Sequence, residues 1–147
     1  MTTDLAIVGG TGLTKLAGLE ITERIIVHTS YGEPSAPVTY GNLCGKRVMF
    51  LPRHGYGHTI PPHKINYRAN MWALKEAGAK SVVAVAAVGG INKLHKPGDV
   101  IIPDQIIDYT WSRIHTYFEE GLTQVTHIDF TEPYSEKLRQ LLLRSAS

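Results

Sequence analysis

Residues 81–88 read Ser-Val-Val-Ala-Val-Ala-Ala-Val and contain no polar side chain after Ser81. A short run of this kind predicts a strand that is buried on both faces. Leu5-Ala6-Ile7-Val8 predicts a second buried strand. Between the two, apolar residues recur at helical spacing and predict a helix that closes at Gly78. They are Ile65, Ala69, Trp72, Ala73 and Ala77. We therefore expect an α/β fold with a mostly parallel, mixed central sheet flanked by helices.

Further short apolar runs predict more strands. They lie at residues 25–27, 38–40, 48–51 and 100–103, with an apolar continuation at 106–107. Residues 42–45 predict a hairpin turn, and Pro97-Gly98-Asp99 predicts another turn. Residues 111–124 show little periodicity, which indicates a long surface excursion.

The last segment predicts a helix after Pro133 with Leu138, Leu141 and Leu142 on one side. That makes two good helices, and a sheet covered on both faces needs more. We therefore interpret residues 1–147 as a single domain that is incomplete.

Composition excludes several classes of protein. The chain has 147 residues, of which 43% are hydrophobic and 19% charged, so it can bury a core and is not disordered. A net charge of +2 with scattered basic residues argues against a nucleic-acid surface. The longest apolar run, residues 82–88, is far too short to span a membrane. One cysteine, Cys44, and no basic leader are typical of a cytoplasmic protein.

A glycine-rich turn follows the first predicted strand. In Gly9-Gly10-Thr11-Gly12 the backbone N–H groups can turn toward an anion, and the Thr11 hydroxyl adds a donor. Lys15 stands where a dinucleotide fingerprint requires a third glycine, and the Gly-Lys-Ser/Thr ending of a Walker loop is missing. A tight turn without any ligand explains this segment equally well.

Arg53-His54-Gly55-Tyr56-Gly57-His58-Thr59 follows another predicted strand. In open α/β sheets, ligands bind beyond the carboxyl ends of strands, where an arginine beside a histidine suits an oxyanion. A solvated surface loop is one alternative. Zinc held by His54, His58 and His63 is another, but no carboxylate or cysteine joins these histidines, and we expect no metal.

A third strand end carries Ala86-Ala87-Val88-Gly89-Gly90. Small residues permit the close approach of a planar ligand, although close packing alone also explains them. Packing explains any one of these loops, but three such loops at three strand ends together favour a site, and the first two loops could share it.

Several motifs occur in one register over nearly the whole chain. They are Gly9-Gly10-Thr11-Gly12-Leu13, Pro52-Arg53-His54-Gly55, His58-Thr59-Ile60-Pro61-Pro62, the segment 66–75, Gly89-Gly90-Ile91, the segment 96–100 and the segment 127–133. On these residues the sequence resembles the trimeric purine nucleoside phosphorylases, and in particular the methylthioadenosine and methylthioinosine phosphorylase branch. Residues 88–91 and 127–130 look most like the bacterial S-methyl-5′-thioinosine phosphorylases.

The resemblance implies phosphorolysis of a 5′-modified purine nucleoside in a homotrimer, with inorganic phosphate as co-substrate and no cofactor. Thr11, Arg53 and His54 would hold phosphate, and Ala86 and Ala87 would line the same region. Gly89 and His127 would contact the nucleoside, with His127 near the 5′ substituent, commonly that of a neighbouring subunit.

Two departures from the family pattern stand out. Relatives often carry a hydroxyl or amide side chain where this sequence has Ala86, and losing that donor would weaken phosphate binding by about 1 kcal/mol. Family members are also considerably longer, so the resemblance implies that the catalytic residues lie beyond Ser147. A catalytically inactive fragment that binds phosphate or assembles with a longer partner is therefore a second hypothesis.

Overall fold

The computed structural model describes residues 4–13 and 15–146. These residues form two compact units. The first contains the described residues up to Ala87 together with Arg113–Tyr117, and the second contains Val88–Ser112 and the described residues from Phe118 onward.

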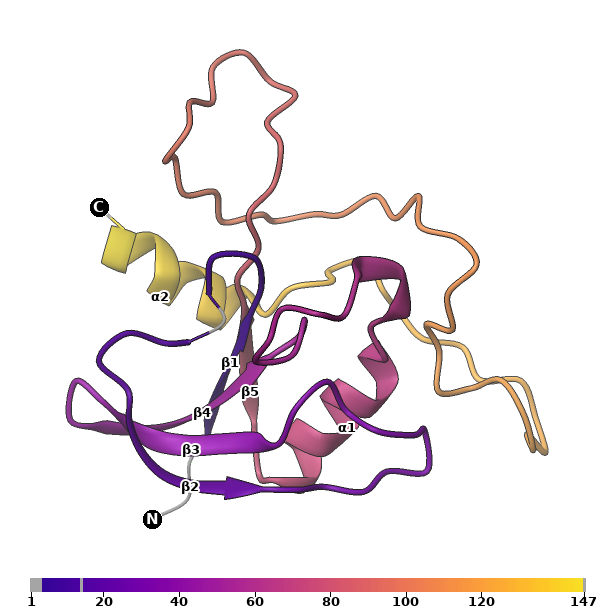
Figure 1. Cartoon of the computed structure of the whole chain (residues 1–147). Helices are drawn as coiled ribbons and strands as arrows, with labels where there is room; N and C mark the ends of the chain where they lie inside the picture. Colours follow the sequence, from indigo (N-terminus) through magenta and orange to yellow (C-terminus); the bar gives the residue numbers. More distant parts are fainter. Residues whose placement is uncertain (1–3, 14, 147) are drawn as a thin grey trace. The chain divides into compact units, whose positions relative to one another are not determined.

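Strand β1 (Leu5–Gly9) lies inside the sheet of the first unit (Figure 1). It pairs in parallel with β4 (Lys46–Pro52) on one side and with β5 (Ser81–Ala84) on the other. Gly9 at the end of β1 stands opposite Pro52 at the end of β4. Apolar β1 therefore has hydrogen-bonding neighbours on both edges, as its sequence predicts.

Strands β2 (Glu20–Ile25) and β3 (Val38–Leu43) extend the sheet beyond β4 by antiparallel pairing. Within the described residues the sheet has five strands in the order β2-β3-β4-β1-β5, which confirms a mixed sheet. Strand β3 turns into β4 through Cys44 and Gly45, whose φ angles are 49° and 73°. Two positive φ angles are typical of a type I′ hairpin, so the predicted turn at 42–45 is confirmed.

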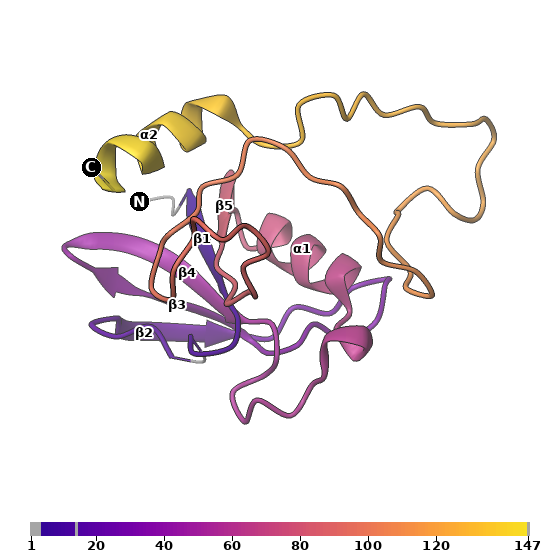
Figure 2. The same cartoon turned by 90° about the horizontal axis from the view of Figure 1, so that it is seen from above.

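Helix α1 (Tyr67–Glu76) lies along one side of the sheet (Figure 2). The Asn66 side chain caps it by accepting a hydrogen bond of 3.0 Å from the Ala69 N–H. Burying Leu74 contributes about 2 kcal/mol to stability. The core combines one side of α1 with one face of the sheet. Its residues are Ala6, Val8, Val38, Tyr40, Met49, Leu51, Ala73 and Leu74.

The loop that leads from the sheet to α1 contains a short 3₁₀ helix, η1 (Pro62–Lys64). The predicted helix is confirmed over residues 67–76 and closes as expected, since Gly78 has a φ of 98°. That left-handed conformation is tolerated best by glycine.

The segment Arg113–Tyr117 packs on α1 and its flank. The Arg68 Nη1 donates to the Thr116 carbonyl at 3.0 Å, and the Tyr117 hydroxyl donates to the Arg68 carbonyl at 2.8 Å. The Tyr117 ring meets Tyr31 edge-on, with 4.9 Å between the ring centres. These contacts fasten a segment distant in sequence to the first unit.

The second unit holds helix α2 (Glu136–Ala146) and the loops of residues 88–112 and 118–135, drawn in orange tones in Figure 2. Gln105 donates to the Thr131 carbonyl at 2.9 Å, and an Arg139 Nη lies 3.9 Å from the Asp104 carboxylate. The predicted turn at Pro97-Gly98-Asp99 and the C-terminal helix are confirmed. No helix in the described part of the chain is long and apolar enough to cross a membrane.

Three strand predictions need correction. Residues 100–103 and 106–107 form no strand, because within the described residues they have no ladder partner, and Val100 is 79% exposed. Strand β5 ends at Ala84, and its valines are only half-buried. Ser81 and Ala84 are exposed in the described structure, so the predicted burial on both faces is wrong. Strand β2 ends at Ile25, so the strand predicted at 25–27 is displaced.

Tyr40 links the sheet to the end of α1 and provides a test of this packing. Its hydroxyl donates to the Ala77 carbonyl at 2.7 Å, and burial raises the pKa of Tyr40 above its ordinary value of 10.0, against the opposing effect of Arg47. The unfolded chain therefore loses the phenolic proton at a lower pH than the folded chain, so stability falls as the pH rises above about 10.

We expect Tyr40→Phe to lower the free energy of unfolding by about 1 kcal/mol at neutral pH, since one hydrogen bond is lost. The variant should also lose less stability than the wild type between about pH 9 and 11. Urea unfolding across this range measures both effects. Tyr109→Phe is the control, because Tyr109 is 87% exposed. Equal alkaline losses in the wild type and Tyr40→Phe would contradict the assignment.

Candidate functional site

Three parallel strands end at the same edge of the sheet. Strands β4, β1 and β5 are neighbours in that order, with Gly9 opposite Pro52 and Val8 opposite Ala84. The loops that leave these strands are the three loops whose sequences together favour a site. The three loops start at the same edge of the sheet because parallel strands have their carboxyl ends on the same side.

Arg53 joins all three strand ends. Its backbone N–H donates at 3.0 Å to the carbonyl of Gly9, which is the last residue of β1. Its side-chain Nη1 donates to the Val85 carbonyl at 2.6 Å, directly after β5. A guanidinium has five N–H donors in a planar fork, so this half-buried side chain keeps donors for an oxyanion.

Gly10 makes room for the Arg53 guanidinium. A β-carbon at position 10 would lie 2.1 Å from Arg53 Nη2 and 2.3 Å from its central carbon. No side chain fits there unless the guanidinium moves. The guanidinium is the end of a flexible side chain, so a larger residue at position 10 would displace it from its hydrogen bond to Val85.

The side chain of His54 is buried, with 6% exposure. Its Nδ1 lies 2.8 Å from the Ile60 carbonyl, and the Ile60 N–H donates back to the His54 carbonyl at 3.1 Å. The His58 ring packs against His54 with 4.7 Å between ring centres. His58 itself adopts a φ of 52°, in the left-handed region. Packing and two reciprocal hydrogen bonds thus fix the orientation of the His54 ring.

The other predicted phosphate residues lie on the same loops of the first unit. Thr11 is exposed on the turn after β1, and Ala86 and Ala87 are exposed just beyond Val85. Ala86 presents a methyl group and cannot donate to phosphate through its side chain.

The predicted nucleoside residues Gly89 and His127 belong to the second unit, where both are exposed. Next to His127, Asp129 accepts hydrogen bonds from the Thr131 hydroxyl and N–H, at 2.7 and 3.0 Å. These bonds lower the pKa of Asp129, the hydroxyl having the larger effect. The turn after His127 thus carries an ionised carboxylate at neutral pH.

The zinc alternative depends on His54, His58 and His63. His54 and His58 are ring neighbours, but across residues 4–13 and 15–146 no three His, Cys, Asp or Glu side chains gather to hold a metal ion.

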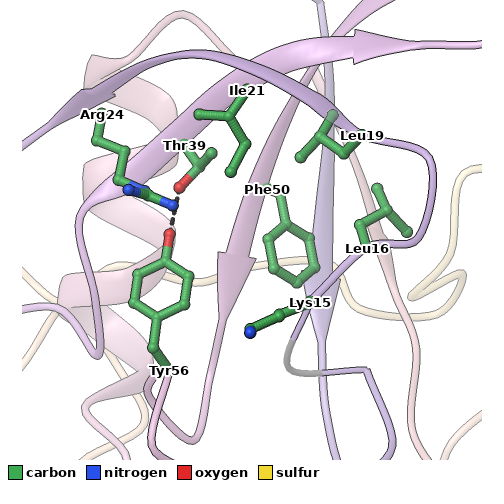
Figure 3. A pocket seen from close by; sticks show the side chains of 8 residues that line it. All are labelled: Lys15, Leu16, Leu19, Ile21, Arg24, Thr39, Phe50 and Tyr56. Atoms are coloured by element: carbon green, nitrogen blue, oxygen red, sulfur yellow. Dashed lines mark hydrogen bonds between the residues drawn. The ribbon is translucent and has the colours of Figure 1, made fainter.

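A cavity of about 300 Å³ lies on the sheet face opposite α1, because Phe50 points away from the core residues Met49 and Leu51. Figure 3 shows the Phe50 ring between Tyr56 on one side and the two leucines on the other. The lining residues are Lys15, Leu16, Leu19, Ile21, Arg24, Thr39, Phe50 and Tyr56. The Thr39 and Tyr56 hydroxyl groups hydrogen-bond to each other there. None of these eight is a predicted phosphate residue, although Lys15 and Tyr56 follow Thr11 and Arg53 closely in the chain.

Sequence reasoning missed two features of the site. The Val85 carbonyl holds Arg53, and a backbone acceptor has no signature in the sequence. The Ile60 carbonyl fixes His54 in the same way. For Gly10 the glycine itself was a signal, but the cation that fills its space was not predictable.

The fold and this strand edge define a class of protein. The family model described as the phosphorylase superfamily matches residues 4–147, so the chain belongs to the phosphorylase superfamily. The resemblance drawn from the sequence motifs is thereby confirmed.

Two relatives show which members of the superfamily this chain is similar to. The S-methyl-5′-thioadenosine phosphorylase of Hyperthermus butylicus is 53% identical over 143 residues, covering 97% of this chain and 52% of that protein. The probable S-methyl-5′-thioinosine phosphorylase of Pseudomonas syringae pv. tomato is 52% identical over 138 residues, covering 94% of this chain and 56% of that protein.

Solved structures give the same result. Methylthioadenosine phosphorylase from Schistosoma mansoni in complex with adenine matches with a TM-score of 0.91 and 35% identity, over 98% of this chain and 53% of that one. The expected nucleoside phosphorylase-like α/β fold is confirmed. The chain spans about half the length of the curated relatives it matches.

The contact between Gly10 and Arg53 can be tested by a double-mutant cycle. We expect Gly10→Ala to lower the free energy of unfolding by about 1 kcal/mol, because the new methyl group displaces the guanidinium from its hydrogen bond to Val85. In an Arg53→Ala background the same change should cost much less. Urea unfolding of the wild type, the two single variants and the double variant measures the coupling free energy between the two positions.

Gly90→Ala is the matched control, since a β-carbon there meets nothing closer than 3.7 Å. It should change stability by no more than about 0.5 kcal/mol. Additive effects of Gly10→Ala and Arg53→Ala would show that the two residues do not compete for the same space.

Proposed function

We propose that this chain is part of a purine salvage pentosyltransferase, a nucleoside phosphorylase. The proposed reaction is phosphorolysis of S-methyl-5′-thioinosine to hypoxanthine and 5-methylthioribose 1-phosphate. The observation that carries the proposal is the convergence of three strand ends on Arg53, with its guanidinium against Gly10 and its neighbour His54 buried.

The chemistry fits such a site. A phosphate oxygen attacks C1′ of the sugar while the bond from C1′ to the purine nitrogen breaks, and the purine leaves with the bonding electrons. The transition state resembles an oxocarbenium ion, so a dianion fixed beside the sugar stabilises it. Arg53 supplies the cation that fixes the dianion, and Thr11 adds a hydroxyl donor. Inorganic phosphate is the co-substrate, and we propose no cofactor and no metal.

The choice of nucleoside rests on the relatives. Those most similar in sequence are named as methylthioadenosine and methylthioinosine phosphorylases. We favour methylthioinosine because residues 88–91 and 127–130 look most like that branch. Methylthioadenosine or a broader set of purine nucleosides is the alternative. Gly89 and His127 are the proposed contacts to the nucleoside, and the residues that act on the purine are proposed to lie outside this chain.

A second candidate function is a catalytically inactive module that binds phosphate or assembles with a longer partner. In either case we propose nucleoside and phosphate as the ligands, a homotrimer as the assembly and the cytoplasm as the compartment. A single exposed cysteine, Cys44, is consistent with a reducing compartment.

Release of free purine separates the two candidates. The 147-residue chain is incubated with methylthioinosine, methylthioadenosine or inosine, with and without inorganic phosphate. We expect phosphate-dependent release of hypoxanthine from methylthioinosine if the chain is an active enzyme. Phosphate binding without release from any nucleoside supports the binding module instead.

Arg53→Ala tests the phosphate site directly. We expect the dissociation constant for phosphate to rise about tenfold or more, because hydrogen bonds to an ion are lost, while that for the nucleoside changes less. Calorimetric titration with phosphate measures the change. Arg24→Ala is the control, since it removes an equal charge at the cavity. Equal weakening for both ligands would count against a phosphate role for Arg53.

A further inference from the structure

The hydrogen bond from His54 to Ile60 determines which ring nitrogen carries a proton. The Ile60 carbonyl oxygen can only accept, so His54 Nδ1, at 2.8 Å, must be the donor. In the neutral imidazole the other nitrogen, Nε2, then has a lone pair and no hydrogen. The reciprocal bond from the Ile60 N–H to the His54 carbonyl holds the backbone of Ile60 next to that of His54.

The loop around the ring is fixed by short-range contacts. The Gly55 N–H donates to the Pro52 carbonyl at 2.9 Å, and the His58 N–H donates to the Gly55 carbonyl at 3.1 Å. The His58 ring, inclined at 47°, packs on that of His54. His54, which directly follows Arg53 in the chain, is therefore a preorganised hydrogen-bond acceptor.

We propose that His54 Nε2 selects oxyanions that retain a proton, a proposal that rests on the phosphate-binding role of this site. At about pH 8, hydrogen phosphate and hydrogen arsenate carry two negative charges and one O–H group, which can donate to the Nε2 lone pair of a neutral imidazole. Sulfate carries the same charge but no proton, so its oxygen lone pairs face that of Nε2. Arg53 attracts all three dianions alike, and the discrimination comes from His54.

The expected result is a preference among ions of equal charge. Calorimetric titration of the 147-residue chain at about pH 8 should give sulfate a dissociation constant about tenfold higher than that of phosphate, with arsenate close to phosphate. Equal affinities for phosphate and sulfate overturn the role of His54 and leave the phosphate site standing. Binding of none of the three ions overturns both the phosphate site and this proposal.

Two substitutions locate the effect on Nε2. His54→Asn keeps a donor at the position of Nδ1, so the bond to Ile60 survives, but nothing replaces Nε2. We expect phosphate to weaken while sulfate, which no longer faces the Nε2 lone pair, binds at least as well as before, so that the tenfold preference disappears. Sulfate binding that is not weakened is the internal control for an intact site.

His54→Gln is the complementary variant. Its amide reaches the position of Nε2 and can present an oxygen acceptor there, while the bond to Ile60 is lost. It should keep more of the preference for phosphate than His54→Asn, with a lower thermal unfolding midpoint. The assignment to Nε2 would be overturned if His54→Asn kept the wild-type preference for phosphate over sulfate. It would also be overturned if His54→Asn showed a stronger preference than His54→Gln.

Discussion

The parallel pairing of β1 with both β4 and β5 is the constraint on which the site depends. Because β1 lies between them, the residues after Gly9, Pro52 and Ala84 leave the sheet side by side. The register sets Arg53 next to Gly9 and within reach of Val85. A slip of one residue would turn every side chain of β1 to the other face and separate these partners.

Backbone groups hold the ionisable side chains of this site. Carbonyl oxygens of Val85 and Ile60 accept from Arg53 and His54, respectively. A carbonyl acceptor satisfies a buried donor without neutralising its charge, so Arg53 remains a full cation. A carboxylate partner in place of Val85 would compete with any incoming anion. The arrangement thus suits a site that binds an anion.

Local signals predicted much of this fold, and contacts distant in sequence account for the rest. The glycines of the β3–β4 turn and the apolar spacing of α1 are local, and both predictions were confirmed. Burial of β5 depends on which elements cover its two faces, and the strand predicted at 100–103 depends on a ladder partner. Neither can be read from the local composition, and both predictions were wrong. The grouping of Arg53 with the glycine loop was predictable from strand ends, whereas its Val85 partner was not.

The return of the chain at Arg113–Tyr117 affects how the sequence can vary. Residues 88–112 leave the first unit after Ala87 and come back to a segment fastened by Arg68 and Tyr117. They therefore form a closed loop, and the entropy of closing such a loop grows slowly, by about 0.6 kcal/mol for each doubling of its length. Insertions and deletions between the two anchors therefore cost the fold little entropy of loop closure.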